Sequence, residues 1–117
     1  MKPLLPELDR FVRAMFRTPR PDAELAALTA SAARLPLDAS LALLAYPYPR
    51  EHWRAAAHAV KVPLLYVVTP QFAAQAKNLK RNRPATETTV FEEAGHALFV
   101  DEPARFNALL ADFAARL

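Results

Sequence analysis

The run Val62-Pro-Leu-Leu-Tyr-Val-Val68 decides how the rest of the sequence is divided. Its residues are β-branched, aromatic or leucine apart from one proline, which is typical of a strand covered on both faces of a parallel sheet. It is far shorter than the roughly 18 to 20 apolar residues that cross a bilayer, so no transmembrane segment is expected. We therefore expect a water-soluble protein in which this strand is buried.

Three further elements follow this strand. Pro70 to Asn82 has helical composition, Glu87-Thr-Thr-Val-Phe91 is a second β-rich run, and Pro103 to Leu117 has apolar residues at helical spacing. A connection of about twenty residues between two apolar strands requires a parallel, right-handed crossover. The expected order over residues 61–117 is strand, helix, strand, helix.

The first sixty residues predict helices and no strand. Most of the 11 prolines lie before residue 71 and divide this part into short helical stretches. Helices are expected over residues 4–16, 24–35, 39–45 and 50–60, with Asp38 as the cap of the third. The chain length of 117 residues predicts one domain, with a helical front part (1–60) and an α/β unit (61–117).

A second informative stretch is Val90-Phe-Glu-Glu-Ala-Gly-His-Ala-Leu-Phe-Val-Asp-Glu-Pro-Ala-Arg-Phe-Asn107. Gly95 is expected to permit a sharp turn just before His96. A histidine on a loop at the carboxyl end of a strand can be aimed at a substrate and can move a proton. Asp101 is predicted to cap the final helix, with Pro103 in its first turn.

These two stretches resemble the carboxyl-terminal end of the α/β-hydrolases. In that superfamily a Val-Pro-apolar strand is followed by a strand that leads into Gly-His and then by a proline-started helix containing Phe. The resemblance implies a half α/β-hydrolase fold in which residues 1–60 correspond to cap-like helices. It also implies that His96 is the general base of a Ser-His-acid triad. Without the resemblance, a histidine beside Ala97-Leu-Phe-Val100 is more typical of a hydrogen-bonded, partly buried side chain.

The nucleophile expected of such a hydrolase is missing from the sequence. A Gly-x-Ser-x-Gly elbow needs two glycines, and Gly95 is the single glycine of the chain. Ser31 and Ser40 lie in helical or pre-helical segments, where a hydroxyl more naturally bonds the backbone. Gln71 stands where the superfamily often has its acid, and the oxyanion-hole loop has no counterpart.

Two functions of different classes therefore stay open. The first is an ester-type hydrolase, or part of one, in which His96 acts on a small ester together with a serine supplied from elsewhere. The second is a non-catalytic half-hydrolase scaffold or fragment. In either case one edge of the strand at residues 62–68 lacks a neighbour, and a two-stranded sheet is not expected to be stable alone. We expect a homodimer, through strand pairing or exchange of the front helices, or a complementing hydrolase half.

Other partners and cofactors are not expected. The absence of cysteine excludes disulfides and thiolate metal sites, and there is no glycine-rich phosphate loop, so no cofactor is predicted. His52 and His58 are six residues apart on a helix, which is the wrong spacing for a metal site, and are read as surface or boundary residues. The start of the sequence does not resemble a signal peptide, so a cytoplasmic location is expected.

The net charge of +3 does not predict nucleic-acid binding. Its basic cluster lies near a helix end, where cations offset the helix dipole, and no aromatic residue is interleaved for base stacking. The cluster consists of Lys77, Lys80, Arg81 and Arg83. The aromatic residues that could line a substrate pocket are instead predicted to fill the core, and they are Tyr46, Tyr48, Trp53 and Phe72.

Overall fold

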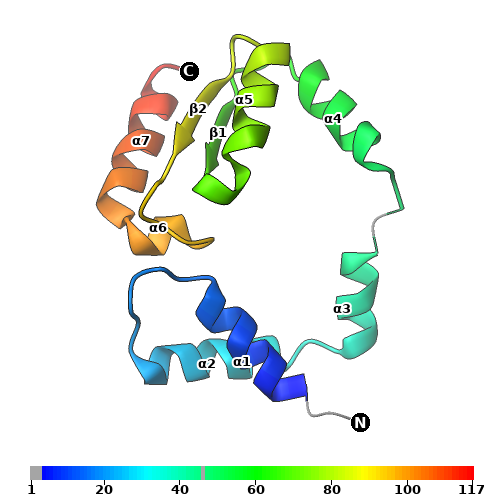
Figure 1. Cartoon of the computed structure of the whole chain (residues 1–117), viewed down its shortest axis with the longest axis vertical. Coiled ribbons are helices and arrows are strands. Elements are labelled where there is room, and N and C mark those ends of the chain that lie inside the picture. The colour runs from blue at the N-terminus through cyan, green and yellow to red at the C-terminus, as the bar shows by residue number, and fades with distance from the viewer. Residues whose placement is uncertain (1–3, 46) are drawn as a thin grey trace.

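A computed structural model describes residues 4–45 and 47–117 (Figure 1). Within them the elements follow in the order α1 (Leu4–Ala14), α2 (Asp22–Ala32), α3 (Leu37–Leu44), α4 (Arg50–Ala59), β1 (Leu65–Val68), the 3-10 turn η1 (Pro70–Phe72), α5 (Ala73–Asn82), β2 (Glu87–Val90), α6 (Leu98–Asp101) and α7 (Pro103–Ala115). The mixed α/β class and the helical front part are as predicted. The short helix α6 was not anticipated.

The sheet consists of β1 and β2, which pair in parallel with Leu65 opposite Glu87 and Val68 opposite Val90. The connection between them runs through η1 and α5, so the expected strand-helix-strand unit is confirmed. In Figure 1, α5 and α7 lie on opposite sides of the two strands. The carboxyl-terminal part is therefore a three-layer unit with a very narrow sheet.

The core of this unit lies between the sheet and the last two helices. Phe91, Ala94 and Leu98 are buried there, and Phe106 and Leu109 of α7 pack against them. Phe91 directly follows β2 and is 0% exposed. These contacts hold the loop after β2 between the sheet and α7.

Two arginine side chains, Arg105 and Arg116, contact β2 and the residue that follows it. The guanidinium carbon of Arg105 lies 4.0 Å from the centre of the Phe91 ring, within cation–π range. Arg105 also donates a hydrogen bond of 3.1 Å to the carbonyl oxygen of Val90. At the other end of the sheet, Arg116 donates two bonds of 2.7 Å to the Glu87 carboxylate, and this pairing lowers the pKa of Glu87.

The strand β1 is shorter and less buried than predicted. It begins at Leu65 instead of Val62, and Val62 itself is 66% exposed. Only Val68 is buried, while the side chains from Leu65 to Val67 are half-buried. The prediction of a buried strand was therefore wrong for most of β1: helices lie on both sides of the sheet, but only Val68 is buried, and among the described residues one edge of β1 has no neighbouring strand.

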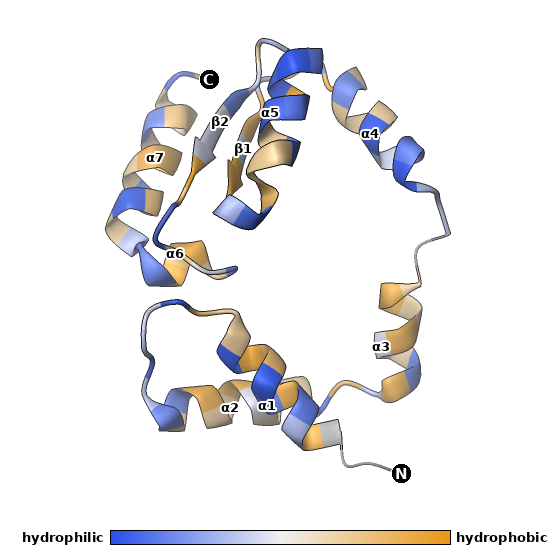
Figure 2. Cartoon of the chain, in the orientation of Figure 1, coloured by the Kyte–Doolittle hydropathy of each residue, from blue (hydrophilic) through white to orange (hydrophobic). Residues whose placement is uncertain are grey.

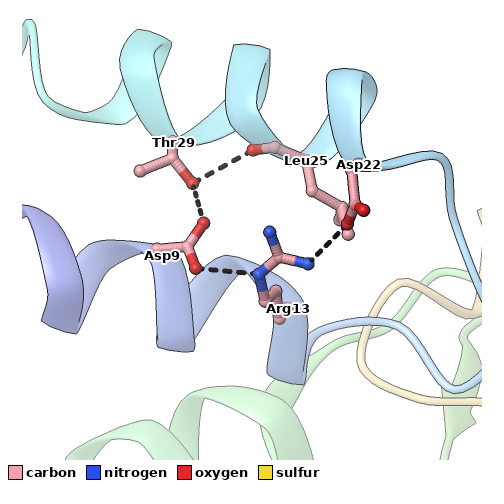
Figure 3. A network of polar contacts seen from close by, with 5 residues as sticks. All are labelled: Asp9, Arg13, Asp22, Leu25 and Thr29. Atoms are coloured by element: carbon pink, nitrogen blue, oxygen red, sulfur yellow. Dashed lines mark hydrogen bonds and ion pairs between the residues drawn. The ribbon is translucent and has the colours of Figure 1, made fainter.

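The first two helices form a hairpin that polar side chains hold together (Figure 3). Arg13 of α1 donates to Asp9 at 2.8 Å and to Asp22 of α2 at 3.1 Å. Thr29 of α2 donates to Asp9 at 3.3 Å and to the Leu25 carbonyl at 3.0 Å. The hydrogen bond from Arg13 is the largest cause of the lowered pKa of Asp9. The network links α1 to α2, and Val12 and Leu25 of the two helices are buried.

The remaining front helices pack loosely. Neither α3 nor α4 contains a buried residue. The radius of gyration is 17.1 Å, whereas a compact domain of this length has about 13 Å. In Figure 1, α3 and α4 extend away from the sheet in an arc, and Figure 2 shows α3 as largely apolar. The described residues therefore form an open arrangement.

Two predictions about this part were wrong. Tyr48 and Trp53 are exposed and do not form core, and Phe72 is also exposed, while Tyr46 lies outside the described residues. Asp38 does not cap α3, because the helix starts after Pro36 without any side-chain cap. Pro36 presets a suitable backbone angle for the start of the helix, and Asp38 lies within the first turn.

Among residues 4–45 and 47–117, no single helix has the length and apolar character needed to cross a membrane. Helices α2 and α3 meet these criteria only as a pair that is bent by 89°.

Replacing Phe91 by Ala should lower the free energy of unfolding by about 3–5 kcal/mol, because a fully buried aromatic ring is lost and a cavity remains. Chemical denaturation monitored by circular dichroism measures this change. Phe11→Ala is the matched control, since Phe11 is 65% exposed and should change stability by no more than about 0.5 kcal/mol. Equal losses for the two variants would contradict the assigned core.

Candidate functional site

A cleft of about 540 Å³ lies at the carboxyl ends of the two strands. Its walls are the end of β1 with the following turn (residues 66–72 and 75), the loop after β2 (residues 94–96 and 98), and Ala14 and Arg17 near the end of α1. Ligands of open α/β sheets bind in the crevice outside the carboxyl ends of the strands. The position of the cleft therefore suits a substrate.

His96 lies on the wall of this cleft and is exposed. It belongs to the loop between β2 and α6, next to Gly95. None of the hydrogen bonds found among the described residues involves its imidazole. The ring is therefore accessible to a substrate or to a further side chain, and the catalytic role of His96 stays a prediction.

Gly95 serves a different purpose from the one predicted. It does not have a positive φ angle, so the turn before His96 does not require glycine for its backbone conformation. Instead, a Cβ atom at this position would lie 2.8 Å from the carbonyl oxygen of Met15 and 2.9 Å from the amide nitrogen of Arg17. Glycine is needed because the segment after α1 approaches the loop this closely.

Asp101 also has a role other than the predicted helix cap. It is the last residue of α6, and α7 begins after Glu102 without a side-chain cap, with Pro103 in its first turn as expected. The Asp101 carboxylate accepts three backbone hydrogen bonds, which come from the N–H groups of Gly95 (2.7 Å), Arg17 (2.9 Å) and Thr18 (3.0 Å). It thereby joins the histidine loop to the segment after α1.

The environment of Asp101 favours its charged form. Burial raises the pKa of this carboxyl, but the backbone hydrogen bonds from Arg17, Gly95 and Thr18 together outweigh burial and leave the pKa lowered. Hydrogen bonds to a carboxylate stabilise its ionised state. The junction is therefore strongest when Asp101 is ionised.

The segment of residues 15–18, which we call the α1–α2 turn, makes further contacts with the histidine loop. The carbonyl oxygen of Met15 accepts a hydrogen bond of 2.8 Å from the N–H of Ala97. Arg17 donates to the Glu92 carbonyl at 3.1 Å and forms an ion pair of 3.1 Å with Glu93. Backbone groups on both sides of His96 are thus tied to the same turn.

The cleft also contains residues that sequence reasoning did not assign to a site. Tyr66 and Phe72 contribute aromatic surface, and the Tyr66 hydroxyl donates to the Gln75 side chain at 2.9 Å. Gln71, expected near the position of the family acid, does line the cleft. No local signal marks Arg17 as a neighbour of His96, because the two lie far apart in sequence and meet only through tertiary contacts.

Neither serine reaches the cleft. The Ser40 hydroxyl donates to the Pro36 carbonyl at 3.2 Å, and the Ser31 hydroxyl accepts from Arg34 at 3.1 Å. The part of the chain that the structure describes places no carboxylate on the cleft wall. It also contains no group of three His, Cys, Asp or Glu residues that could hold a metal ion. The described cleft thus has a possible base without a serine or an acid.

The histidines on α4 lie away from the cleft. His52 is exposed and stacks on the ring of Tyr48, with 4.3 Å between the ring centres, and His58 is half-buried. Neither of them is among the residues of the cleft wall. Their prediction as surface or boundary residues is confirmed.

No protein-family model matches this sequence, and no curated protein is significantly similar to it. The fold does match the X-ray crystal structure of "a putative aryl esterase from Burkholderia cenocepacia", with a TM-score of 0.77 and 25% sequence identity over 99% of this chain. The chain has part of an α/β-hydrolase fold. It spans 44% of the length of the esterase chain, so the remainder of the hydrolase fold has no counterpart in these residues.

Replacing Asp101 by Asn should lower the free energy of unfolding at neutral pH. It should also make this free energy change less as the pH is lowered. A lowered pKa in the folded state means that the carboxylate stabilises the fold above its ordinary pKa of 3.8, and that this contribution is lost as the pH falls through the lowered value. At neutral pH the variant should lose about 1–3 kcal/mol, because backbone N–H groups lose an acceptor. Denaturation curves measured from neutral to acid pH test this.

The charge-matched control is Asp38→Asn on α3, where Asp38 is exposed. It removes the same charge without touching the junction and should leave the pH dependence close to that of the unaltered chain. If Asp101→Asn and the unaltered chain differ by the same amount at every pH, ionised Asp101 does not stabilise the junction.

Replacing Gly95 by Ala should push the α1–α2 turn away from the histidine loop, because the new methyl group would overlap the Met15 carbonyl and the Arg17 amide. The expected result is faster hydrogen exchange at the amides of Arg17, Thr18 and Ala97, which lose their acceptors. Unchanged exchange at all three amides would contradict the close approach. Ala104→Gly, on an exposed position of α7, is the control for altered glycine content.

Proposed function

We propose that this chain supplies the general base of an ester hydrolase, and that His96 is this base. The observation that carries the proposal is the position of His96, which lines an open cleft at the carboxyl ends of two parallel strands within part of an α/β-hydrolase fold. A general base must lie within hydrogen-bond reach of the proton that it removes. The accessible imidazole meets this requirement for a group entering the cleft.

The proposed reaction begins with a serine hydroxyl that belongs to another part of the hydrolase fold. His96 takes the hydroxyl proton as the serine oxygen bonds to the ester carbonyl carbon, and the resulting imidazolium gives this proton to the departing alcohol or phenol oxygen. Water then repeats the sequence on the acyl-serine, releasing the acid and restoring the serine. The residues described here hold the base and shape the cleft.

We propose esters with an aromatic group as the substrate class. Tyr66, Phe72 and Leu98 give apolar surface to the cleft that His96 also lines. A volume of about 540 Å³ lies within the range of roughly 300–1,000 Å³ that is usual for small-molecule pockets. The fold match to a protein described as an aryl esterase supports the same class.

A second candidate is a non-catalytic scaffold that keeps part of the hydrolase fold for assembly or binding. The observation that favours it is the absence of a serine and of a carboxylate from the described cleft wall. In this alternative His96 is one more surface histidine. The two candidates therefore differ in whether His96 contributes more to ester cleavage than other histidines do.

Cleavage of p-nitrophenyl acetate by the purified chain distinguishes them. Because no serine reaches the cleft, the chain alone should be slow, but His96 should act on the ester directly or through water. His96→Ala should therefore lower the rate above buffer by roughly tenfold, which is less than the usual contribution of a positioned general base. The release of nitrophenol is followed by absorbance.

His52→Ala and His58→Ala are the matched controls, since they remove the two histidines of α4. Both variants should keep most of the activity of the unaltered chain. Imidazole on any surface cleaves activated esters weakly, so equal losses for all three histidine variants would reject His96 as the base and favour the scaffold.

A further inference from the structure

We infer that the free edge of β1 and the apolar stripe of α3 form a docking surface for a polypeptide with the remaining part of the α/β-hydrolase fold. This inference rests on the proposed function only in assigning the nucleophilic serine to that polypeptide. The strand edge, the exposed leucines of α3 and the extent of the fold match support the surface itself.

The free edge of β1 presents unpaired backbone groups. The carbonyl oxygens of Leu64 and Val68 accept hydrogen bonds of 2.9 and 2.8 Å from the N–H groups of Glu87 and Phe91, so these oxygens face β2. Backbone groups alternate in direction along a strand, so those of the intervening residues 65 and 67 face the other edge. Within residues 4–45 and 47–117, no hydrogen bond to another element is found for that edge.

Such an edge is a template for a further strand. The residues that follow it, Thr69 to Phe72, form part of the cleft wall. A strand added to β1 would therefore end close to the cleft that contains His96. The unpaired edge of β1 thus lies next to the cleft, whose described wall lacks a serine and an acid.

The helix α3 supplies the second part of the surface. Leu37, Leu41 and Leu44 lie at helical spacing on one stripe, and all three are exposed, Leu44 at 70%. Single exposed leucines are ordinary on a protein surface. In α3, however, no residue is buried, so its leucine stripe is an apolar face without a partner among the described residues. In Figure 1, α3 lies apart from the sheet, on the side of the molecule away from α7.

The fold match supports the choice of occupant. The match covers 99% of this chain, including α3, although nothing among the described residues buries α3. The matched esterase chain is more than twice as long, since this chain spans 44% of it. The open layout is therefore that of a larger fold, in which further polypeptide packs against these elements.

A second copy of this chain fits the observations less well. It could pair with β1, but it would bring only the same sequence, whose single glycine cannot form the nucleophile elbow. A polypeptide with the rest of the hydrolase fold accounts for the strand edge, the leucine stripe and the incomplete cleft together. The homodimer therefore becomes the competing outcome of the test.

The first experiment combines light scattering with hydrogen exchange on the purified chain over a range of concentrations. The docking proposal expects a monomer with slow exchange at the inward amides of Tyr66 and Val68, and with fast exchange at Leu65, at Val67 and throughout α3. A dimer that protects Leu65 and Val67 would replace the proposed occupant with a second copy. A monomer that protects α3 would remove the docking surface altogether.

The second experiment is co-expression with the part of the Burkholderia cenocepacia protein that the fold match leaves out. The two polypeptides should purify together, and the exchange of Leu65 and Val67 should slow at least tenfold in the complex. The double variant Leu41→Lys, Leu44→Lys should abolish co-purification. The matched control Leu110→Lys, at a site on α7 that is 48% exposed, should retain it.

Absence of a complex with the unaltered chain, or equal loss with the α3 double variant and the α7 control, would overturn the proposal. Both readouts are independent of ester cleavage. A complex that forms but hydrolyses no ester would reject the proposed function and keep the docking surface. If the two co-expressed polypeptides form no complex while the purified chain still needs His96 to cleave the ester, the docking surface is rejected and the base is kept.

Discussion

The carboxylate of Asp101 joins two segments that lie 84 positions apart in the sequence, and the shape of the candidate site depends on this junction. Its two oxygens accept backbone N–H groups from Arg17, Thr18 and Gly95. These amides would otherwise lack a partner at a place where the two segments touch. An ionised acceptor forms stronger hydrogen bonds than a neutral one, which suits a contact that must fix two loops at once.

The consequences of the junction extend in both directions along the chain. On one side it holds the α1–α2 hairpin against the carboxyl-terminal unit, so that Ala14 and Arg17 become part of the cleft wall. On the other side it fixes the backbone on both sides of His96 while leaving the imidazole exposed. A backbone held in place beside an accessible ring suits a general base, because the base must lie within hydrogen-bond reach of the proton that it removes.

The same molecule combines a well-packed unit with surfaces that lack partners. Phe91 is enclosed by the sheet, α6 and α7, whereas α3 and α4 bury no residue. A narrow sheet explains this contrast, because two strands cover only part of the helices that a full hydrolase sheet would carry. The open layout is thus a consequence of how few strands are present, and it is consistent with a fold that covers 44% of a longer esterase chain.

Apart from the short helix α6, the sequence by itself determined the order of the elements and the position of His96 after the second strand, because hydrophobic periodicity, proline positions and the Gly-His pair are local signals. It did not determine why Gly95 is a glycine or what Asp101 binds. Those roles depend on the α1–α2 turn, and no local pattern shows that residues 15–18 approach residues 95–101. The exposure of Tyr48 and Trp53 was also decided by tertiary structure, since burial depends on which surfaces meet, and the described residues bring no surface against α4 that buries any of its side chains.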